Sequence, residues 1–395
     1  RRIIMKALRN LMDKMAPVFE EGGALEKLYP LWEAVDVGIY NTNKKTGQAP
    51  HIRDSVDIKR VMILVVFALL PLYMFGAINI GVQSSIAQNI TRTWNENFLV
   101  GFNLIIPIFL VTFITGGFWE VLFAPVRKHD VNEGFFVTGF LIPLIVPASI
   151  PLWQVAIATS FGVVIGKEIF GGTGYNIFNP ALTARAFIFF AYPGAISGDK
   201  VWVSGVDGYS GATGLSIPAA VEGGNAKQLL DSFSQFDFSW WNMFIGWIPG
   251  SIGETSKILI LLSAGFLIFT KVASWRIMIG GVLGLVATAW LTNGLASYSD
   301  NTMLSLPAEY HLVMGGFLFG IVFMATDPVS ASQTNKGRWI YGILIGVMTI
   351  IIRSINPAYP EGTMLAILFL NAFSPLIDYY VIKGNIKKRM ARYAK

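Results

Sequence analysis

The sequence predicts an all-α integral membrane protein with about ten transmembrane helices, arranged as two inverted five-helix repeats that contain broken helices. Hydrophobic residues make up 53% of the 395 residues and charged residues only 14%, whereas soluble domains average roughly 25% charged residues. Several apolar runs reach about 20 residues, which is enough to cross a hydrocarbon core ~30 Å thick. Short motifs of the first half also recur, in the same order, in the second half.

Ten spans are predicted, five in each half of the chain. The first membrane repeat covers 60–195 and the second covers 256–382, with a long loop, 196–255, between them. A basic amphipathic region, 1–59, precedes the repeats, and a basic tail, 383–395, follows them. The predicted spans are 60–82, 98–118, 134–150, 151–169, 180–195, 256–271, 276–295, 311–327, 338–354 and 362–382.

The distribution of Lys and Arg predicts the orientation. With the amino terminus inside, the inner segments hold all but six of the 30 Lys and Arg residues, and such an excess is typical of cytoplasmic segments. Both termini are therefore predicted to be cytoplasmic and the loop 196–255 to lie outside. The six exceptions are Arg92, Arg185 (within a span), Lys200, Lys227, Lys257 and Arg353.

Repeated motifs predict the internal symmetry. Each half contributes an odd number of spans, so the second half lies upside down relative to the first. Inverted repeats of this kind place ligands and ions near the membrane midplane, where helices break. The stretches 139–149, 162–166 and 179–181 correspond to 320–330, 342–346 and 356–358.

The composition excludes several cofactor classes. The chain has no cysteine, which rules out disulfides, thiolate-held iron–sulfur clusters and cysteine-attached haem or flavin. Three histidines do not suit a bis-His haem. The net charge of +6 does not indicate nucleic-acid binding, because the basic residues lie where membrane topology needs them.

A polar, glycine-rich heptapeptide in the outer loop carries the strongest functional signal. Asp207–Thr213 reads D-G-Y-S-G-A-T, the acceptor motif on which flavin transferases esterify FMN phosphate to the final threonine. We expect Thr213 to carry covalent FMN, in a loop formed by Asp207, Ser210, Gly211 and Ala212. The alternative is an ordinary turn, because Asp, Gly and Ser favour turns.

A second polar stretch, 167–180, ends one predicted span and opens the next. Non-helical backbone at membrane depth must be buried in protein or line a cavity. Asn176 and Asn179 offer both donors and acceptors, which suits the pyrimidine edge of a flavin, and we expect a second flavin here. The alternative is a helix cap followed by Pro180 in the first turn.

Two acids lie in or beside predicted spans. An acid at membrane depth costs roughly 2.5–3.5 kcal/mol on insertion scales, so Asp327 and Asp378 are candidate Na⁺ ligands or helix caps. Phe319 and Phe323, one helical turn apart, precede Asp327. They could form an apolar gate or simply pack.

A glycine pair and two aromatic residues predict a quinone pocket at the cytoplasmic ends of the second and third spans. Gly116 and Gly117 allow a flat ring to approach, and Phe135 and Phe136 could line it. The alternative is helix–helix packing through small residues.

Together these motifs resemble a known family. The ten spans, the outer S-G-A-T loop, K-E-I-F-G-G-T-G-Y-N-I-F-N-P-A and M-A-T-D-P-V-S-A look like those of the B subunits of the Na⁺-translocating NADH:quinone oxidoreductases. A sister family, the D subunit of the Rnf ferredoxin:NAD⁺ complex, shares the core motifs. The long amino-terminal region with H-I-R-D-S-V-D at 51–57 fits the first family better.

The resemblance implies a bacterial inner-membrane protein that passes electrons from covalent FMN through riboflavin to ubiquinone and helps to translocate Na⁺. It implies five partner subunits, a flavin transferase during maturation, and contact with membrane lipids. The implied ubiquinone site lies near Gly116, Gly117 and Glu133. The implied Na⁺ passage involves Glu120, Phe319, Phe323, Asp327 and Asp378.

A function from another class remains open. A flavin-free channel or secondary transporter would also suit an inverted repeat with broken helices. The D-G-Y-S-G-A-T loop discriminates the two, because a transporter does not require it.

Overall fold

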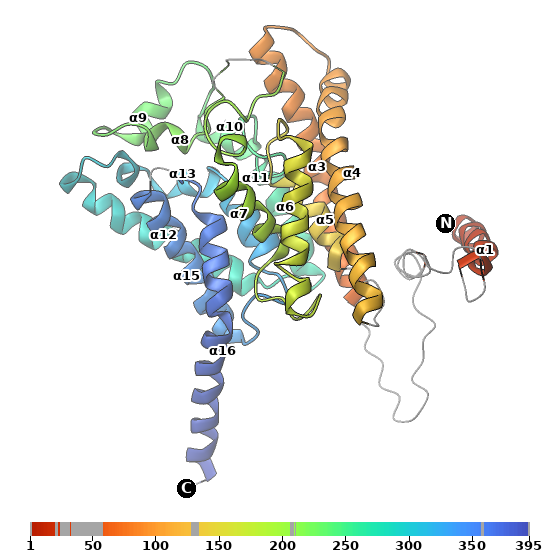
Figure 1. Ribbon diagram of the computed structural model, residues 1–395. Helices are drawn as coiled ribbons and strands as arrows, with labels where there is room; N and C mark the ends of the chain where they lie inside the picture. The colour runs from red at the N-terminus through yellow and green to blue at the C-terminus, as the bar shows by residue number, and fades with distance from the viewer. Residues whose placement is uncertain are drawn as a thin grey trace.

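The chain folds into a bundle of helices (Figure 1). The computed structural model describes residues 2–19, 23, 32, 58–127, 134–205, 209, 211–356 and 359–393. Over these ranges the only β pairing is an isolated bridge between Glu222 and Asn301. Of the predicted region 1–59, the described part is mainly α1 (Arg2–Phe19).

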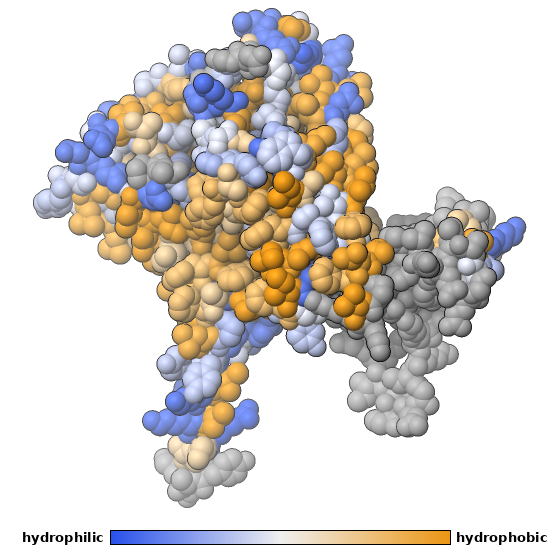
Figure 2. Space-filling model, viewed as in Figure 1, coloured by the Kyte–Doolittle hydropathy of each residue, from blue (hydrophilic) through white to orange (hydrophobic). Residues whose placement is uncertain are grey.

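Six helical segments are long and apolar enough to cross a membrane within the described part of the chain. At 1.5 Å per residue, the 21 residues of α15 rise about 31 Å, which matches the hydrocarbon core. A broad hydrophobic band crosses the visible face of the bundle (Figure 2). The six segments are α3 (Ile58–Gln88), α4 (Trp94–Arg127), α6 (Leu152–Val164) extended by η2 (Glu168–Phe170), α12 (Trp275–Leu295), α15 (Asn335–Ile355) and α16 (Thr363–Tyr393).

The remaining predicted spans coincide with shorter or interrupted helices. Three are apolar but brief: α5 (Gly134–Leu144), α7 (Pro180–Ala191) and α11 (Lys257–Phe269). The 11 residues of α5 rise only about 17 Å, so irregular backbone completes its path. The fourth is broken into α13 (Ala308–Val313), α14 (Phe317–Phe319) and a π-helical turn, η6 (Gly320–Met324).

Local sequence explains where the short helix α7 begins. The Asn179 side chain accepts hydrogen bonds from the backbone N–H groups of Ala181 and Leu182, at 3.0 and 3.3 Å, and Pro180 occupies the first turn. This is a standard N-cap. The cap reading of Asn179 is therefore confirmed, and it places the start of α7 deep in the bundle.

The segment 196–255 forms a small packed unit at one end of the bundle. Its short helices are α8 (Ser216–Ala219), α9 (Ala226–Asp231) and α10 (Trp240–Ile245), drawn above α12 and α15 and beside the upper ends of α3 and α4 in Figure 1. It has an apolar core of its own, completed by residues 303–314. The sequence predicted a loop here, but the apolar side chains within it are numerous enough to pack.

Candidate functional site

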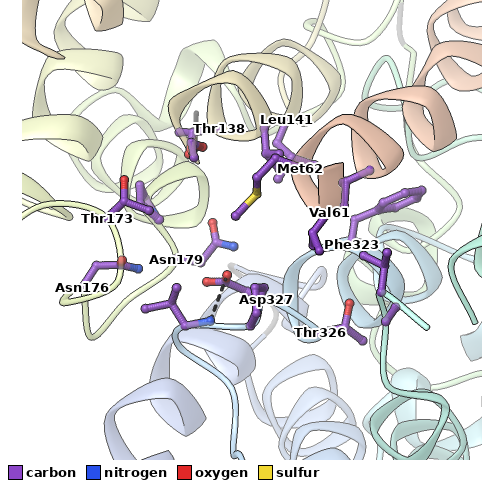
Figure 3. Close-up of a pocket in the computed structure, with 18 of the residues that line it drawn as sticks. Val61, Met62, Thr138, Leu141, Thr173, Asn176, Asn179, Phe323, Thr326 and Asp327 are labelled. Atoms are coloured by element: carbon purple, nitrogen blue, oxygen red, sulfur yellow. Dashed lines mark hydrogen bonds between the residues drawn. The ribbon is translucent and has the colours of Figure 1, made fainter. Parts of the chain in front are cut away.

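An inner cavity of about 70 Å³ lies where the short or broken helices α5, α7 and η6 meet. Met62 of α3, Thr138 of α5 and Asp327 line it together with residues of the 167–180 stretch. In Figure 3 the Asp327 and Asn179 side chains point toward the same central space. This volume suits a few water molecules or an ion, and it is well below the 300–1,000 Å³ typical of small-molecule sites.

Asp327 lies between this cavity and a second one of about 120 Å³. The second cavity is lined by Lys271, Ser274 and Arg338 at the ends of α11, α12 and α15. The Asp327 carboxylate accepts hydrogen bonds from the Val329 N–H at 3.3 Å and the Ser330 hydroxyl at 2.7 Å. It therefore caps the turn after η6 and still lines both cavities.

The two asparagines of the 167–180 stretch serve the loop itself. The Asn176 amide donates to the Phe178 carbonyl at 2.9 Å and accepts from the Gly174 N–H at 3.3 Å. Asn179 caps α7. Both line the inner cavity, but flavin contact at these residues stays a prediction.

Phe319 and Phe323 lie side by side in the broken helix. Both are buried, and their ring centroids are 5.0 Å apart. Phe323 lines the inner cavity and belongs to the π-helical turn, a feature often found at functional sites. Phe323 thus forms part of the cavity wall, and Phe319 packs against it.

An outer cavity of about 20 Å³ lies at the other end of α11, beside Thr213. Ten residues of α11 separate Lys257, in this cavity, from Leu267, in the inner one. That separation corresponds to a rise of about 15 Å. The Phe319–Phe323 pair lies on the parallel stretch 315–328, which also runs from one cavity to the other.

The acceptor heptapeptide is only partly described, since Asp207 and Ser210 lie outside the described residues. Gly211 is buried, and Ala212 and Thr213 are half-buried. A Cβ at Gly211 would approach Val203 to 2.7 Å. Gly211 therefore allows close packing against Val203.

Buried charged side chains hold the break between α13 and α14. Arg353, which is 0% exposed, donates to the carbonyls of His311, Met314 and Glu361 at 2.7, 3.2 and 3.1 Å. Lys257 donates to the Gly315 carbonyl at 3.0 Å. Backbone that leaves the helix at membrane depth must find such partners.

An ion pair joins the first repeat to the end of the segment 196–255, next to this break. The Arg185 guanidinium lies 2.7 Å from the Glu254 carboxylate, and both are buried. The sequence analysis used Arg185, Lys257 and Arg353 only as exceptions in a charge count. Their position inside or at the edge of apolar runs was the available signal for a buried network.

Glu120 belongs to a second buried cluster, with Lys167 and Glu168. The Lys167 ammonium contacts the Glu120 carboxylate and lies 3.3 Å from that of Glu168. All three side chains are at most 3% exposed, and Lys167 also lines the inner cavity. The structure thus brings Glu120 near the inner cavity through Lys167, the first residue of the 167–180 stretch.

The two glycines of the predicted quinone pocket differ. A Cβ at Gly116 would collide with the Phe135 ring, whereas one at Gly117 would meet nothing within 4 Å. Gly116 thus serves close packing of α4 on α5, and Gly117 leaves an open position. Phe136 is half-buried, and Glu133 lies outside the described residues.

Asp378 anchors the loop that precedes α15. Its carboxylate accepts from the backbone N–H groups of Gln333 and Thr334, at 2.7 and 3.0 Å, and from the Ser332 and Thr334 hydroxyls, at 2.7 and 2.6 Å. Asp378 and Asp327 thus fix the two ends of the turn between η6 and α15. Across the described residues, no group of three or more His, Asp or Glu side chains could hold a metal ion.

Comparison with known proteins identifies the family. A family model described as "NQR2, RnfD, RnfE family" matches residues 45–387. The chain belongs to the NQR2/RnfD/RnfE family. Its relatives in this family include the B subunit of the Na(+)-translocating NADH-quinone reductase of Chromohalobacter salexigens, 52% identical over 98% of this chain and 97% of the relative. The proteins of the same name from Yersinia pestis and Pseudomonas aeruginosa strain LESB58 are 51% and 50% identical, each over 98% of this chain and 99% of the relative.

Family membership and the six long apolar helices make the chain an integral membrane protein.

Proposed function

We propose that this chain is the membrane component of a respiratory Na⁺ pump, in which electrons pass from covalent FMN on Thr213 through riboflavin to ubiquinone while Na⁺ leaves the cytoplasm. The relatives are named as B subunits of a Na(+)-translocating NADH-quinone reductase, and this supports the proposal. The observation that carries it is the D-G-Y-S-G-A-T motif, whose Thr213 lines the outer cavity. When bound, the flavins supply one-electron and two-electron chemistry that no side chain of this chain supplies.

Some of the residues around Thr213 suit a phosphate ester, although the carboxylates of Glu254 and Glu361 line the same cavity. Thr213 is half-buried. The Thr255 hydroxyl, which lines the same cavity, is buried with no hydrogen-bond partner among the described residues. The Lys257 ammonium lies in the same lining. A hydroxyl donor and a cation suit a phosphodiester oxygen.

We further propose that the ten segments form two inverted five-helix repeats. Several equivalent helix pairs pack in equivalent ways, which supports this arrangement, although the packing of α3 on α4 has no counterpart of similar extent between α11 and α12. The packing of α4 on α6 corresponds to that of α12 on α15, α6 on α7 to α15 on α16, and α3 on α5 to α11 on α14. Six Lys and Arg residues lie outside the predicted inner segments, and three of these are buried in the protein: Arg185, Lys257 and Arg353. Because buried residues do not report a side of the membrane, these three do not contradict cytoplasmic termini and an outer unit 196–255.

The inner cavities and the phenylalanine pair suit a Na⁺ passage. Oxygen ligands suit a hard cation, and Asp327 supplies a carboxylate between two water-sized cavities. Phe319 and Phe323 stand between the inner and outer cavities. Glu120 and Asp378 are proposed to help Na⁺ reach this passage. In this structure both are engaged within the protein, Glu120 with Lys167 and Asp378 with the loop 332–334.

Removing the Asp327 charge is expected to weaken the Na⁺ dependence of quinone reduction. Asp327→Asn keeps an oxygen that can accept the Val329 N–H and loses the charge. The Na⁺ concentration for half-maximal activity should rise about tenfold, the equivalent of ~1.4 kcal/mol, with flavin content unchanged. Steady-state activity against Na⁺ concentration measures this. If Asp327→Asn behaves like the unaltered chain and only Asp327→Ala is impaired, Asp327 is a turn cap and not a Na⁺ ligand.

The open side of α4 at Gly117 is the proposed position of the quinone ring, with Phe135, Phe136 and Glu133 nearby. By topology it lies toward the cytoplasmic side, about a membrane thickness, ~30 Å, from Thr213. That distance is too long for one fast electron step, so an intermediate carrier is needed. Riboflavin near Asn176 and Asn179 is the proposed carrier, although the inner cavity of about 70 Å³ that these residues line is too small to enclose it in this structure.

Filling the Gly117 position is expected to raise the apparent KM for quinone or to confer inhibitor resistance, with both flavins retained. Gly117→Leu adds a side chain where nothing lies within 4 Å, so the fold should tolerate it. Gly116→Leu is the matched comparison, because its side chain collides with Phe135 and should lower stability instead. Equal KM values for Gly117→Leu and the unaltered chain would place the quinone elsewhere.

The experiment that tests the proposed function is a search for covalent flavin. The chain is expressed with and without a flavin transferase, denatured and separated on a gel. A fluorescent band should appear only with the transferase, and mass spectrometry of the peptide spanning 205–220 should show added FMN. An unmodified peptide from the co-expressed sample would contradict the proposal.

One alternative is favoured by a specific observation. Two cavities on either side of a phenylalanine pair would also suit a flavin-free channel or transporter, and the absence of covalent flavin would favour it.

An RnfD-type role in a ferredoxin:NAD⁺ complex is compatible with the family description. The relatives' names favour the Na⁺-translocating complex, whose other five subunits and the surrounding lipids would be the partners.

A further inference from the structure

The last helix extends well beyond the bundle. α16 has 31 residues, and its end projects away from the other helices in Figure 1. Asp378 is hydrogen-bonded to Gln333 and Thr334, just before α15 begins at Asn335. Since α15 alone spans about the hydrocarbon thickness, the level of Asp378 marks the inner edge of that core. The residues after Asp378 therefore rise about 22 Å beyond it.

This projecting end carries an apolar stripe. Tyr379, Ile382, Ile386 and Met390 follow one another at spacings of three and four residues, so they share one face of the helix. They are 55%, 48%, 52% and 68% exposed. All residues from Ile382 to Arg392 are exposed. The stripe runs along the helix axis and away from the membrane, so the hydrocarbon core covers little of it.

Basic residues flank the stripe, and residues 379–392 contain no acid. Lys383 and Lys387 lie on one side of the stripe and Arg389 on the other, with the rest of the basic residues behind. The five basic residues of this end are Lys383, Lys387, Lys388, Arg389 and Arg392. An apolar stripe with charged flanks is the pattern of a helix that packs against another protein surface.

Anionic lipid headgroups account for only part of this pattern. Lys383 rises about 7 Å above the Asp378 level, within the headgroup layer. Arg389 and Arg392 rise about 16 and 21 Å, so Arg392 lies beyond a Debye length of ~8 Å from the lipid surface. Binding of lipid headgroups to the basic residues would also leave the apolar side chains of Ile386 and Met390 exposed to water.

The chain's own segments do not suit the stripe either. The other described helix from the same side, α1, is itself basic, with Arg2, Lys6, Arg9 and Lys14 against Asp13. A second copy of α16 would bring like charges together, which is unfavourable. Charge complementarity therefore requires an acidic occupant.

We propose that the exposed end of α16, residues 379–392, is a docking helix for an acidic protein surface with an apolar strip, on the cytoplasmic side of the membrane. The apolar stripe supplies the contact, and the flanking basic residues select an acidic partner. This surface includes neither Thr213 nor any residue that lines the three cavities, and the inference holds whether or not the chain carries flavin.

A photocrosslinking experiment in native membranes tests this proposal. A benzophenone amino acid replaces Ile386 in the full chain, and a second chain carries it at Leu262, which is 65% exposed on α11 and should label lipid. The probe at 386 should crosslink to an acidic segment of one protein, identified by mass spectrometry. The triple variant Lys387→Glu, Arg389→Glu, Arg392→Glu should reduce the yield about fivefold or more, as should 0.5 M salt.

Matched controls decide between a specific partner and general charge effects. Reversing two exposed lysines of the outer unit, with Lys200→Glu and Lys227→Glu, should leave the crosslink yield unchanged. Replacing acids of the crosslinked segment with Lys should restore the yield in the triple variant. Crosslinking at 386 only to lipid or to a second copy, no crosslink at all, or a yield that the triple variant leaves unchanged would each overturn the proposal.

Discussion

Thr213→Ala is expected to abolish covalent flavin on this chain completely, because the phosphoester has no other hydroxyl at the final position of the motif. Among the described residues the Thr213 side chain makes no hydrogen bond; its backbone carbonyl accepts from the Ser216 hydroxyl at 2.8 Å, and the alanine variant retains that bond. The folded yield should therefore be unchanged. In-gel flavin fluorescence and the mass of the 205–220 peptide measure the loss.

The control for this prediction is another hydroxyl of the outer unit. Ser232 is exposed, and its hydroxyl donates only to the Leu229 carbonyl at 3.0 Å. Ser232→Ala should keep the full fluorescence of the unaltered chain. Fluorescence that persists in Thr213→Ala would move the attachment to a different residue, and loss in both variants would point to a general defect in maturation.

Arg353→Met is expected to be the most destabilising single change among those considered. It removes the donor to three carbonyls, those of His311, Met314 and Glu361. Leaving a buried acceptor without its hydrogen bond costs about 1–3 kcal/mol, and three acceptors lose their donor here. The thermal midpoint in detergent and the yield of monodisperse protein should both fall sharply.

Two further variants separate the cause of that loss. Arg353→Lys keeps the charge but cannot reach three carbonyls with a planar fork, so it should be intermediate. Lys227→Met removes an exposed cation and should have little effect. A thermal midpoint for Arg353→Met within error of the unaltered chain would show that other groups hold the break between α13 and α14.

The sequence was sufficient to locate the six helices that are long enough to cross a membrane, because long apolar runs indicate burial in lipid directly. It also located the turns at Asn179-Pro180 and Asp327-Pro328, where cap chemistry is local. It could not distinguish Gly116 from Gly117, because which of them faces Phe135 depends on how α4 is rotated against α5. It also could not show that Lys257 and Arg353 are buried, because a charge count assigns a residue to a side of the membrane and not to a depth.

The packed unit at 196–255 was also beyond local reasoning. Its core depends on residues 303–314, which lie far along the chain, and no periodic pattern links the two stretches. Asp378 illustrates the same limit: its four hydrogen bonds to Ser332, Gln333 and Thr334 join segments more than 40 residues apart. Whether such an acid is a ligand or an anchor is decided by tertiary neighbours.

The start of α7 has a consequence for how firmly the inner cavity can hold an ion. Pro180, the first residue of that helix, lines the cavity together with Asp327. A helix amino terminus carries roughly half a positive charge from its aligned peptide dipoles, and Asn179 neutralises only part of it. A cation beside Asp327 is therefore attracted by the carboxylate and repelled by the helix end at the same time. An ion that passes through must bind weakly enough to leave, and this opposition favours brief residence over tight capture.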